Sequence, residues 1–438
     1  MAPTAAIVTL GCRVNQYESA AVSEKLRAAG FIIVPPGPGA DVTVINTCAV
    51  TAESGRKSRQ MIRRAAAENP GGYVIVTGCL AELEAEKLSR MARVAGVMGN
   101  GSKEKIALAA IAAVTGEGTP CGIDVPDISA APYDGLTVKE PQKCRSYVKI
   151  EDGCGNKCAY CVIPRVRGPV RSKSEDEVLR EVEAQIRAGC REIILTGIET
   201  GSYGEDRRVP GGERPLASLL RRIDGLGVER IGMGSLDPSV MDDGFIETIS
   251  SLRSVLPHFH LSVQSGSSSV LRRMRRKYNA DMLRERIAAL RDAVRGVTLS
   301  ADVIVGFPGE TEEEFLETVG FFRETRFLHL HIFPYSPRPL TEAASMSGQL
   351  GMNEKRDRLR RLSAAEAEIK GALLREYAEL HRKEPVRVLV EKAEGGFAFG
   401  HSEHYVEVSF PGGEDDVGQV RGVRLLDVSG DRCVGKTK

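Results

Sequence analysis

Three cysteines stand close together in the stretch Gly153-Cys154-Gly155-Asn156-Lys157-Cys158-Ala159-Tyr160-Cys161. Their spacing is Cys-x3-Cys-x2-Cys, and they follow an apolar, strand-like run. Three thiolates this close favour a metal, but they are one ligand short of a closed tetrahedral site. An iron-sulfur cluster on three thiolates keeps one iron open, where a small molecule can bind. The alternative is a zinc knuckle that a distant Cys or His completes.

The composition is that of a globular, multidomain protein. A chain of 438 residues with 27% charged residues predicts two or three domains. We find no run of ~18 apolar residues and no basic flank before the first apolar residues, so we expect no membrane partner and a cytoplasmic location. In a reducing compartment, ten cysteines indicate metal or redox chemistry rather than disulfides. A net charge of +1 leaves nucleic-acid binding to local patches.

Residues 1–118 are predicted to form a doubly wound parallel sheet. Strand-like runs at 5–10, 41–46, 73–77 and 94–98 alternate with helical patterns. Cys12, Cys48 and Cys79 each follow one of the first three strands, and the carboxyl ends of parallel strands share one edge. We therefore predict a second three-thiolate cluster on these residues. The alternative is three small, buried, apolar cysteines.

Residues 119–143 contain four prolines and no sustained periodicity, which predicts an irregular linker. Cys121 and Cys144 stand at its two ends. Neither has a partner at ligand spacing, so we predict that both are structural.

Residues 144–375 are predicted to form a partial barrel. Strand-like runs occur at 147–150, 192–196, 230–234, 258–264, 298–305 and 327–333, separated by helical segments. Six β/α units are too few for a full eight-fold barrel, and reactive groups are expected at the carboxyl ends of the strands. Polar or glycine-rich runs follow four of the strands; each alone could be an ordinary turn. From these runs we select, as cofactor-binding candidates, Gly197, Glu199, Ser235, Gln264, Asp302 and Gly306.

The C-terminal part combines a helix with short strands. An amphipathic pattern covers about 353–384. After Pro385, five short alternating segments predict a small all-β barrel, and we place this last domain at 376–438.

Basic residues cluster at 56–64, 165–173 and 272–277. The ordinary interpretation of such a run is a solvated helix face. Because all three lie near predicted cluster or rim elements, we interpret them as a phosphate track. The candidates in the last run are Arg272, Arg273, Arg275, Arg276 and Lys277.

The cysteine loop, the six β/α units and the rim motifs resemble the radical S-adenosylmethionine superfamily. The stretch Gly11-Cys12-Arg13-Val14-Asn15-Gln16-Tyr17-Glu18-Ser19 narrows the resemblance to its methylthiotransferases. The residues after Cys12, the run 272–278 and the run 333–339 look most like the branch that acts on N6-threonylcarbamoyladenosine beside the tRNA anticodon. That branch usually has other residues at the positions of Ser262-Val263, Asp237 and Glu199. These differences affect individual contacts rather than the reaction.

This resemblance implies a tRNA partner, two 4Fe-4S clusters and S-adenosylmethionine. The cluster on Cys154, Cys158 and Cys161 would bind S-adenosylmethionine at its open iron and release a 5'-deoxyadenosyl radical. The cluster on the other three cysteines would hold the sulfur that is inserted at carbon 2 of N6-threonylcarbamoyladenosine at position 37. Tyr160 would pack beside the adenine, or alternatively serve only in core packing. The C-terminal barrel resembles TRAM domains, which bind RNA, at Gly400-His401-Ser402-Glu403-His404-Tyr405. The electron donor is not indicated.

Three other functions are compatible with parts of the pattern. A sister enzyme modifies isopentenyladenosine in tRNA, and a related class modifies an aspartate of a ribosomal protein. A non-catalytic iron-sulfur RNA-binding sensor would need no cofactor rim, so the rim motifs argue against it.

Overall fold

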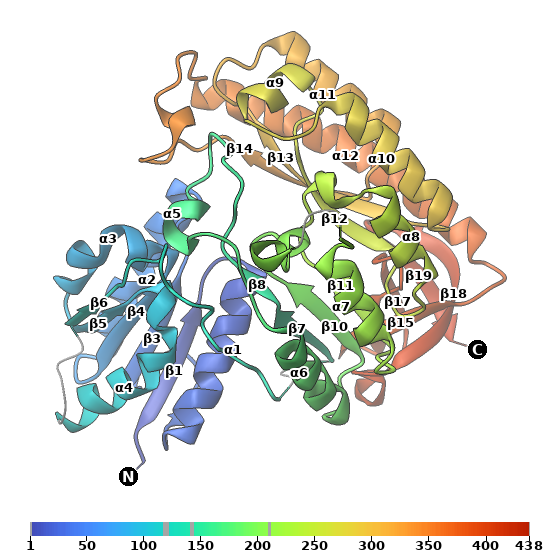
Figure 1. Ribbon diagram of the computed structural model, residues 1–438. Helices are drawn as coiled ribbons and strands as arrows, with labels where there is room; N and C mark the ends of the chain where they lie inside the picture. The colour runs from blue at the N-terminus through green and yellow to red at the C-terminus, as the bar shows by residue number, and fades with distance from the viewer. Residues whose placement is uncertain (1, 117–121, 141–143, 209–211, 438) are drawn as a thin grey trace.

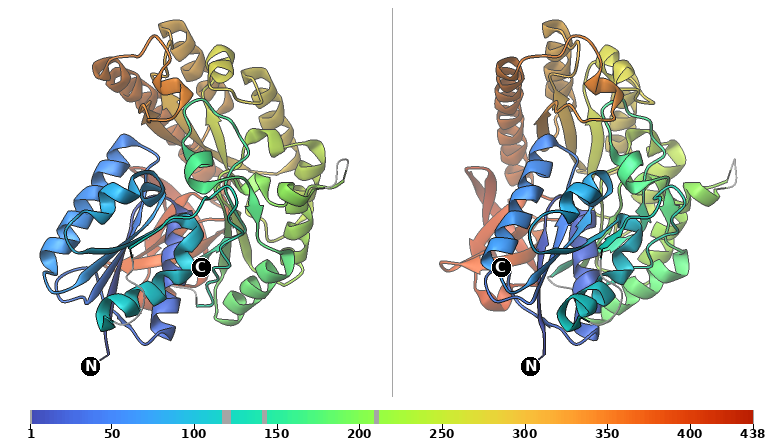
Figure 2. Two further views of the ribbon diagram at one scale, coloured as in Figure 1. Left: turned by 60° about the vertical axis from the view of Figure 1, so that its left-hand side comes forward. Right: turned by 90° about the vertical axis from the view of Figure 1, so that its left-hand side faces the viewer.

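Figure 1 shows the computed structural model of the chain, which describes residues 2–116, 122–140, 144–208 and 212–437. The chain folds into an N-terminal sheet with helices, a central curved sheet with helices outside it, and a small C-terminal barrel. The N-terminal and central units lie side by side, and the small barrel lies behind them in the view of Figure 1, as the turned views of Figure 2 show.

The N-terminal unit is a parallel sheet covered by helices on both faces. Its strands are β1 (Thr4–Thr9), β2 (Ile32–Ile33), β3 (Val42–Thr47), β4 (Tyr73–Gly78), β5 (Val94–Met98) and β6 (Gly122–Asp124), in the order β2-β1-β3-β4-β5-β6. Its helices are α1 (Arg13–Ala28), α2 (Ala52–Glu68), α3 (Cys79–Ser89), the 3-10 helix η1 (Asn100–Lys105) and α4 (Ile106–Thr115). β3 is buried along its whole length because α1 and α4 cover one face of the sheet and α2 and α3 the other. The doubly wound parallel sheet is confirmed.

The central unit contains the six predicted strands within the residues that the structure describes. They are β7 (Arg145–Lys149), β10 (Glu192–Thr196), β11 (Arg230–Met233), β12 (His258–Gln264), β13 (Thr298–Val305) and β14 (His329–Pro334). They pair in parallel in the orders β11-β10-β7 and β12-β13-β14. Isolated bridges, Ile231 to Val255 and Leu236 to Leu261, join the two sheets into one curved wall. The predicted partial barrel is therefore confirmed.

Helices surround the outside of this wall (Figure 1). They are α6 (Glu175–Arg187), α7 (Pro215–Asp224), α8 (Asp243–Ser251), α9 (Ser268–Arg273), α10 (Ala280–Ala293), α11 (Glu312–Thr325) and α12 (Met352–Leu380). The short helix α5 (Ile163–Arg167) lies instead against the N-terminal unit, where Val166 packs in the same apolar cluster as Leu80 of α3 (Figure 1). Shorter elements are the strands β8 (Glu151–Asp152) and β9 (Arg171–Ser172) and the 3-10 helices η2 (Thr200–Ser202), η3 (Glu205–Arg207), η4 (Pro238–Val240) and η5 (Glu342–Ala344). α6 and α11 begin at the capping boxes of Ser174 and Thr311, as the sequence predicts.

The C-terminal unit is a closed barrel in the order β15-β16-β17-β19-β18. Its elements are β15 (Val386–Glu394), β16 (Phe397–His401), β17 (Glu407–Pro411), η6 (Glu414–Asp416), β18 (Val420–Ser429) and β19 (Arg432–Thr437). The small all-β barrel is confirmed. The last turns of α12 pack Leu374 and Tyr377 into the barrel core. The boundary predicted between 375 and 376 therefore lies inside α12, which belongs to both units.

The predicted linker is more structured than its sequence indicates. β6 extends the N-terminal sheet, and Leu136 and Val138 are buried against Tyr17 and Ala21 of α1. Cys121 lies outside the described residues, whereas Cys144 is partly exposed just before β7.

In the part of the chain that the structure describes, no helix is both long and apolar enough to cross a membrane.

The junction between α12 and the C-terminal barrel predicts a pH dependence of stability. Nδ1 of His404 lies 2.9 Å from the hydroxyl of Tyr377. Burial, with a smaller contribution from nearby His381 and Arg230, lowers the pKa of His404 to about 4 from its ordinary value of 6.5. The unfolded chain takes up this proton near pH 6.5 and the folded chain only near pH 4, so stability is lost as the pH falls through that window. The loss amounts to at most ~3 kcal/mol.

Thermal unfolding between pH 7 and pH 4 measures this effect. The decrease of thermal stability with falling pH is expected to become smaller in His404→Gln. It is expected to stay the same in His329→Gln, because His329 lies in an exposed position outside this junction. An equal decrease in both variants would show that His404 is not the responsible group.

Candidate active site

The first cysteine triad lies in the loop between β8 and α5. Gly153 turns the chain at φ +86°, and any side chain there would collide with the returning backbone. The amide of Cys154 donates to the carbonyl of Gly168 at 3.1 Å, and that of Cys161 to the carbonyl of Cys158 at 3.1 Å. These bonds fold the loop so that its three thiols come together.

Buried acidic side chains form the rim next to this loop. Gly197 follows β10, and a Cβ there would lie 1.9 Å from Oε1 of Glu151, so only glycine fits. Oε1 of Glu199 accepts a bond from the amide of Asp237 at 2.6 Å, and the carbonyl of Ser235 accepts one from the residue after Glu199. Burial, followed by the charge of Asp237, raises the pKa of Glu199 to about 8. The arrangement offers fixed polar groups to a polar ligand.

Arg276 belongs to this rim rather than to the outer surface. Its side chain is 5% exposed, and its guanidinium lies 2.7 Å from Oδ2 of Asp237 and 3.1 Å from Sγ of Cys158. A buried guanidinium cannot contact an external phosphate, so its prediction as a tRNA-binding residue is wrong. The preceding residue, Arg275, has a φ of +60°, so the chain turns at this point.

Tyr160 packs within an aromatic group beside the loop. Its ring meets the edge of Phe307 at 6.5 Å between centroids, and Phe307 meets Tyr335 at 5.5 Å. The packing role is thus observed, and contact with an adenine stays a prediction. Gly306 has φ +70°, and a Cβ there would lie 2.5 Å from Cγ of Lys355. Close packing under the rim therefore accounts for this glycine.

Gln264 and Asp302 differ in position. Gln264 ends β12 in a buried, left-handed conformation with φ +69°. Asp302 lies inside β13 rather than after it, and its Oδ2 is 3.2 Å from Nε2 of His260. Its carboxylate therefore belongs to the interior wall of the barrel, below the predicted rim.

The second triad lies at one edge of the N-terminal sheet. Cys12 precedes α1, Cys48 follows β3, and Cys79 begins α3 directly after β4. A Cβ at Gly11 would lie 2.8 Å from Cβ of Cys48, so the first two cysteine loops are in contact. Asn15 fixes them by donating to the carbonyls at the ends of both strands. The edge placement that the sequence predicts is the one observed.

The donor sets suit a polynuclear cluster better than a single ion. Within the described residues, neither triad has its three sulfur atoms within 4.8 Å of one another. A zinc ion about 2.3 Å from each sulfur would require such a distance. Thiolates are the ligands of iron-sulfur clusters, and burial raises the pKa of the Cys79 thiol to about 11, so an ionised sulfur here needs a positive partner. The zinc knuckle is therefore disfavoured.

Comparison with known proteins identifies the family. Residues 148–322 match the Radical SAM superfamily, and residues 4–99 match the group described as Uncharacterized protein family UPF0004. The threonylcarbamoyladenosine tRNA methylthiotransferase MtaB of Bacillus subtilis is 39% identical over 97% of this chain and 94% of its own length. The chain belongs to the radical S-adenosylmethionine methylthiotransferases.

Other relatives of this methylthiotransferase are more distant. The tRNA-2-methylthio-N(6)-dimethylallyladenosine synthase of Thermus thermophilus is 34% identical over 94% of this chain and 86% of its own length. Among solved structures, the radical S-adenosylmethionine methyltransferase TsrM from Kitasatospora setae has a TM-score of 0.56 at 14% identity, covering 78% of this chain and 77% of that one. This last likeness supports the fold alone.

The family assignment makes the chain an enzyme that uses S-adenosylmethionine and 4Fe-4S clusters. The two sets of thiols described above are the residues that fit the clusters. The rim of Glu199, Ser235 and Asp237 offers polar groups beside the first set.

The basic runs of the methylthiotransferase separate into inward and outward side chains. The run at 165–173 was predicted to be a phosphate track, but Arg167 and Lys173 are fully buried and paired with carboxylates. In the run at 272–277, Arg272, Arg275 and Lys277 are exposed. Arg273 pairs with Glu314 at 2.6 Å, and the exposed Arg275 pairs with Glu342 at 2.7 Å. Because Arg272, Arg275 and Lys277 are exposed, an external phosphate can reach them.

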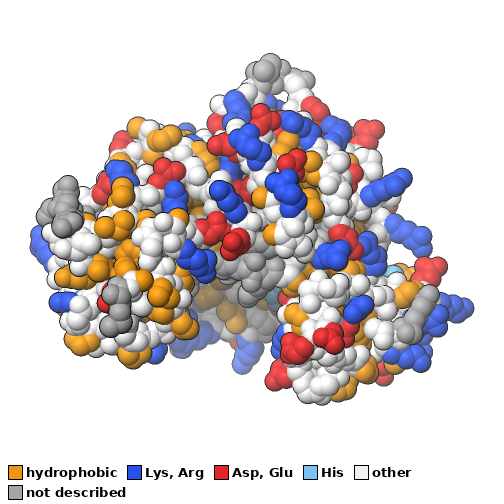
Figure 3. Space-filling view, turned by 90° about the horizontal axis from the view of Figure 1, so that it is seen from below, with side chains coloured by type: hydrophobic (Ala, Val, Ile, Leu, Met, Phe, Trp, Pro, Cys, Tyr) orange, Lys and Arg blue, Asp and Glu red, His pale blue; other side chains and the backbone are white. Residues whose placement is uncertain are grey.

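A broad groove of about 1370 Å³ separates the N-terminal unit from the C-terminal barrel. Seen from below, the surface is hollowed between these two lobes (Figure 3). One wall comes from β1 and α1, the floor from β7, and the other wall from the C-terminal barrel. Aromatic and cationic side chains both line the groove; they include Tyr147, Phe399, His401, Lys392 and Arg432.

Proposed function

We propose that this methylthiotransferase modifies tRNA by replacing the hydrogen on carbon 2 of N6-threonylcarbamoyladenosine with a methylthio group, at position 37 beside the anticodon. Relatives with the name of this activity align over nearly the whole chain. The stretches after Cys12 and at 333–339 resemble the same branch. The dimethylallyladenosine synthases, at 34% identity, make the isopentenyladenosine activity the second candidate.

The proximity of the two triads carries this proposal. Cys79 of the second triad packs in the same apolar cluster as Val162, the residue that follows Cys161 of the first triad. Two thiol sets on segments that pack together are placed to act on one substrate in turn. A binding protein that used a single cluster would not need this arrangement.

When bound, S-adenosylmethionine and the clusters supply the radical and sulfur chemistry that side chains cannot perform. The chain's own groups orient and shield the reactants. Glu199 and Asp237 present buried carboxylates at the rim, and Arg276 places a fixed positive charge beside Cys158. A charged donor on a thiolate offsets its negative charge in a buried site.

The groove supports an RNA substrate. Stacking rings and cations on one surface are the features with which proteins bind single-stranded nucleotides. Tyr147 and Phe399 supply rings, and Lys392 and Arg432 supply charge. The C-terminal barrel and the N-terminal unit can therefore both contact the RNA.

Mass spectrometry of tRNA nucleosides tests the proposal. We expect cells without the gene to lack the methylthio form of N6-threonylcarbamoyladenosine and to keep the methylthio form of isopentenyladenosine. The reverse result would assign the enzyme to the sister activity, and no change in either nucleoside would overturn the tRNA function.

The exposed basic patch is expected to contribute phosphate contacts. Reversal of Arg272, Arg275 and Lys277 to Glu should weaken tRNA binding and reduce the slope of log affinity against log salt by about 2–3. Cleavage of S-adenosylmethionine in the absence of tRNA should be unchanged, because the three side chains are exposed and the ion-pair partner of Arg275, Glu342, lies outside the cysteine loop.

A matched control reverses three exposed arginines on other elements, Arg90, Arg187 and Arg360. Fluorescence anisotropy over a salt series compares the two proteins. Equal slopes of log affinity against log salt in the two proteins would show that the patch is not part of the RNA-binding surface.

A further inference from the structure

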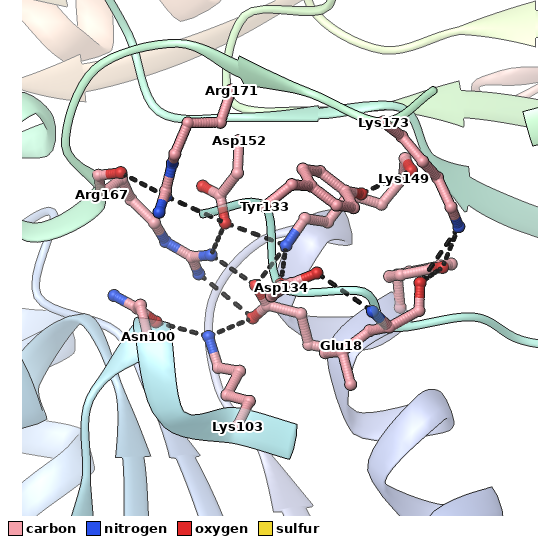
Figure 4. Close-up of polar contacts among 12 residues, drawn as sticks. Glu18, Asn100, Lys103, Tyr133, Asp134, Lys149, Asp152, Arg167, Arg171 and Lys173 are labelled. Atoms are coloured by element: carbon pink, nitrogen blue, oxygen red, sulfur yellow. Dashed lines mark hydrogen bonds and ion pairs between the residues drawn. The ribbon is translucent and has the colours of Figure 1, made fainter. Parts of the chain in front are cut away.

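A buried network of charged side chains joins the N-terminal unit to the central unit (Figure 4). Each contributing side chain is at most 5% exposed. The members come from six separate segments: Glu18 of α1, Lys103 of η1, Asp134 of the linker, Lys149 of β7, Asp152 of β8 and Arg167 of α5.

Lys149 is the centre of the network. Its Nζ lies 3.1 Å from Oε1 of Glu18 and 2.9 Å from Oδ2 of Asp152, and it is also bonded to Asp134. These three carboxylates converge closely enough to hold a cation, and the cation they hold is the Lys149 ammonium. Lys103 adds a second ammonium, 2.8 Å from Glu18.

Arg167 connects this network to the second cysteine triad. Its guanidinium donates to Oδ1 of Asn15 at 2.8 Å, to Asp152 at 3.1 Å and to Glu18. Its Nε lies 3.4 Å from Sγ of Cys79. Burial alone would lower the pKa of Arg167, but Asp152 and Glu18 hold it well above its usual range, so the group stays charged.

The same residue is also part of the first cysteine loop. α5 begins just after Cys161, and the carbonyl of Gly168, which follows Arg167, accepts the amide of Cys154 at 3.1 Å. One side chain thus spans from the loop of the first triad to a sulfur of the second. Displacement of Arg167 would therefore alter both the loop of the first triad and the surroundings of the Cys79 sulfur.

A cationic donor on a ligand sulfur acts on the redox equilibrium of a cluster. Reduction adds negative charge, and a nearby positive charge in a buried site stabilises the reduced form. Hydrogen bonds to the sulfur atoms are among the features that set cluster potentials.

We propose that Arg167 is a positioning residue that fixes the two cysteine triads relative to each other and raises the reduction potential of the cluster on Cys12, Cys48 and Cys79. The inference rests on the proposed function, because it takes these three thiols as cluster ligands. A buried arginine would thus help to set the reduction potential of the second cluster.

The test is a redox titration of the second cluster followed by electron paramagnetic resonance. The full-length protein carries alanine at Cys154, Cys158 and Cys161, so that only the second cluster gives a signal, and dithionite is the reductant. Two charge-balanced double variants are compared in this protein: Arg167→Met with Glu18→Gln, and Lys103→Met with Glu18→Gln. Each removes one cation and one anion from the network, and only the first removes the partner of Cys79.

The Arg167 pair is expected to reduce the equilibrium constant for one-electron reduction about tenfold, a potential lower by ~59 mV. The Lys103 pair is expected to change that constant by less than about twofold. Equal potentials in the two pairs would overturn the role of Arg167.

Two further results keep the test decisive. Arg167→Lys keeps the charge but cannot make all four contacts, so its potential is also expected to fall; a wild-type potential in this variant would overturn the proposal even if the Met variant does not fold. Iron analysis separates the two levels of inference. A protein without iron on the second triad would refute the cluster assignment itself, and with it both proposals, whereas an iron-loaded protein with an unchanged potential refutes only the role of Arg167.

Discussion

Replacement of Cys154 by Ala is expected to abolish the conversion of S-adenosylmethionine to 5'-deoxyadenosine, whereas replacement of Cys48 is expected to leave that conversion intact and to abolish methylthiolation. Cys154 belongs to the loop beside the rim acids, and Cys48 lies at the edge of the N-terminal sheet. Loss of one of three thiolates leaves a cluster without the ligands that hold it. Anaerobic assays of 5'-deoxyadenosine and of modified tRNA measure the two activities separately.

Cys190→Ala and Cys433→Ala are the matched controls for these two variants. Both side chains are buried, and each packs in a hydrophobic cluster that contains none of the triad cysteines. We expect them to retain both activities. Both activities intact in Cys154→Ala or in Cys48→Ala would refute the assignment of that cysteine.

Removal of Lys149 is expected to have the largest effect on folding. Lys149→Met leaves three buried carboxylates with one cation fewer, and removal of one partner from a buried ion network costs about 3–5 kcal/mol. The carboxylates come from α1, the linker and β8, so the contact between the N-terminal and central units should weaken as a whole. Urea unfolding measures the change in the free energy of unfolding.

Lys105→Met is the control for this effect. Lys105 forms an exposed pair with Asp124 at 2.8 Å, and such pairs contribute at most about 1 kcal/mol. Equal losses of stability in the two variants would mean that the buried network does not stabilise the contact between the units.

The sequence predicts the sheets well because their patterns are local. The apolar runs of β10, β12 and β13 have the bounds that the sequence indicates. The edge strands β2 and β6 were missed. β2 has two residues, and β6 lies among prolines and glycines, so neither has enough length for a periodic signal.

The site is predictable where residue type and strand ends decide it. Cys12, Cys48 and Cys79 could be placed together because β1, β3 and β4 are parallel neighbours. Asp302 was placed at the rim although its side chain lies in the interior wall. The sequence shows which residues follow a strand, but not the level within the barrel at which a side chain lies.

The sequence by itself determined the two triads, the three folding units and the family, because cysteine spacing and strand order are written along the chain. Only the tertiary structure decided the direction of the basic side chains. Arg167, Lys173 and Arg276 belong to runs that a sequence shows as positive patches, yet all three turn inward. The physical reason is that burial of a cation depends on carboxylates that the fold brings to it. For Arg167 and Arg276 the carboxylates, Glu18 and Asp237, come from distant segments, whereas Lys173 pairs with Glu181 of the adjoining helix α6.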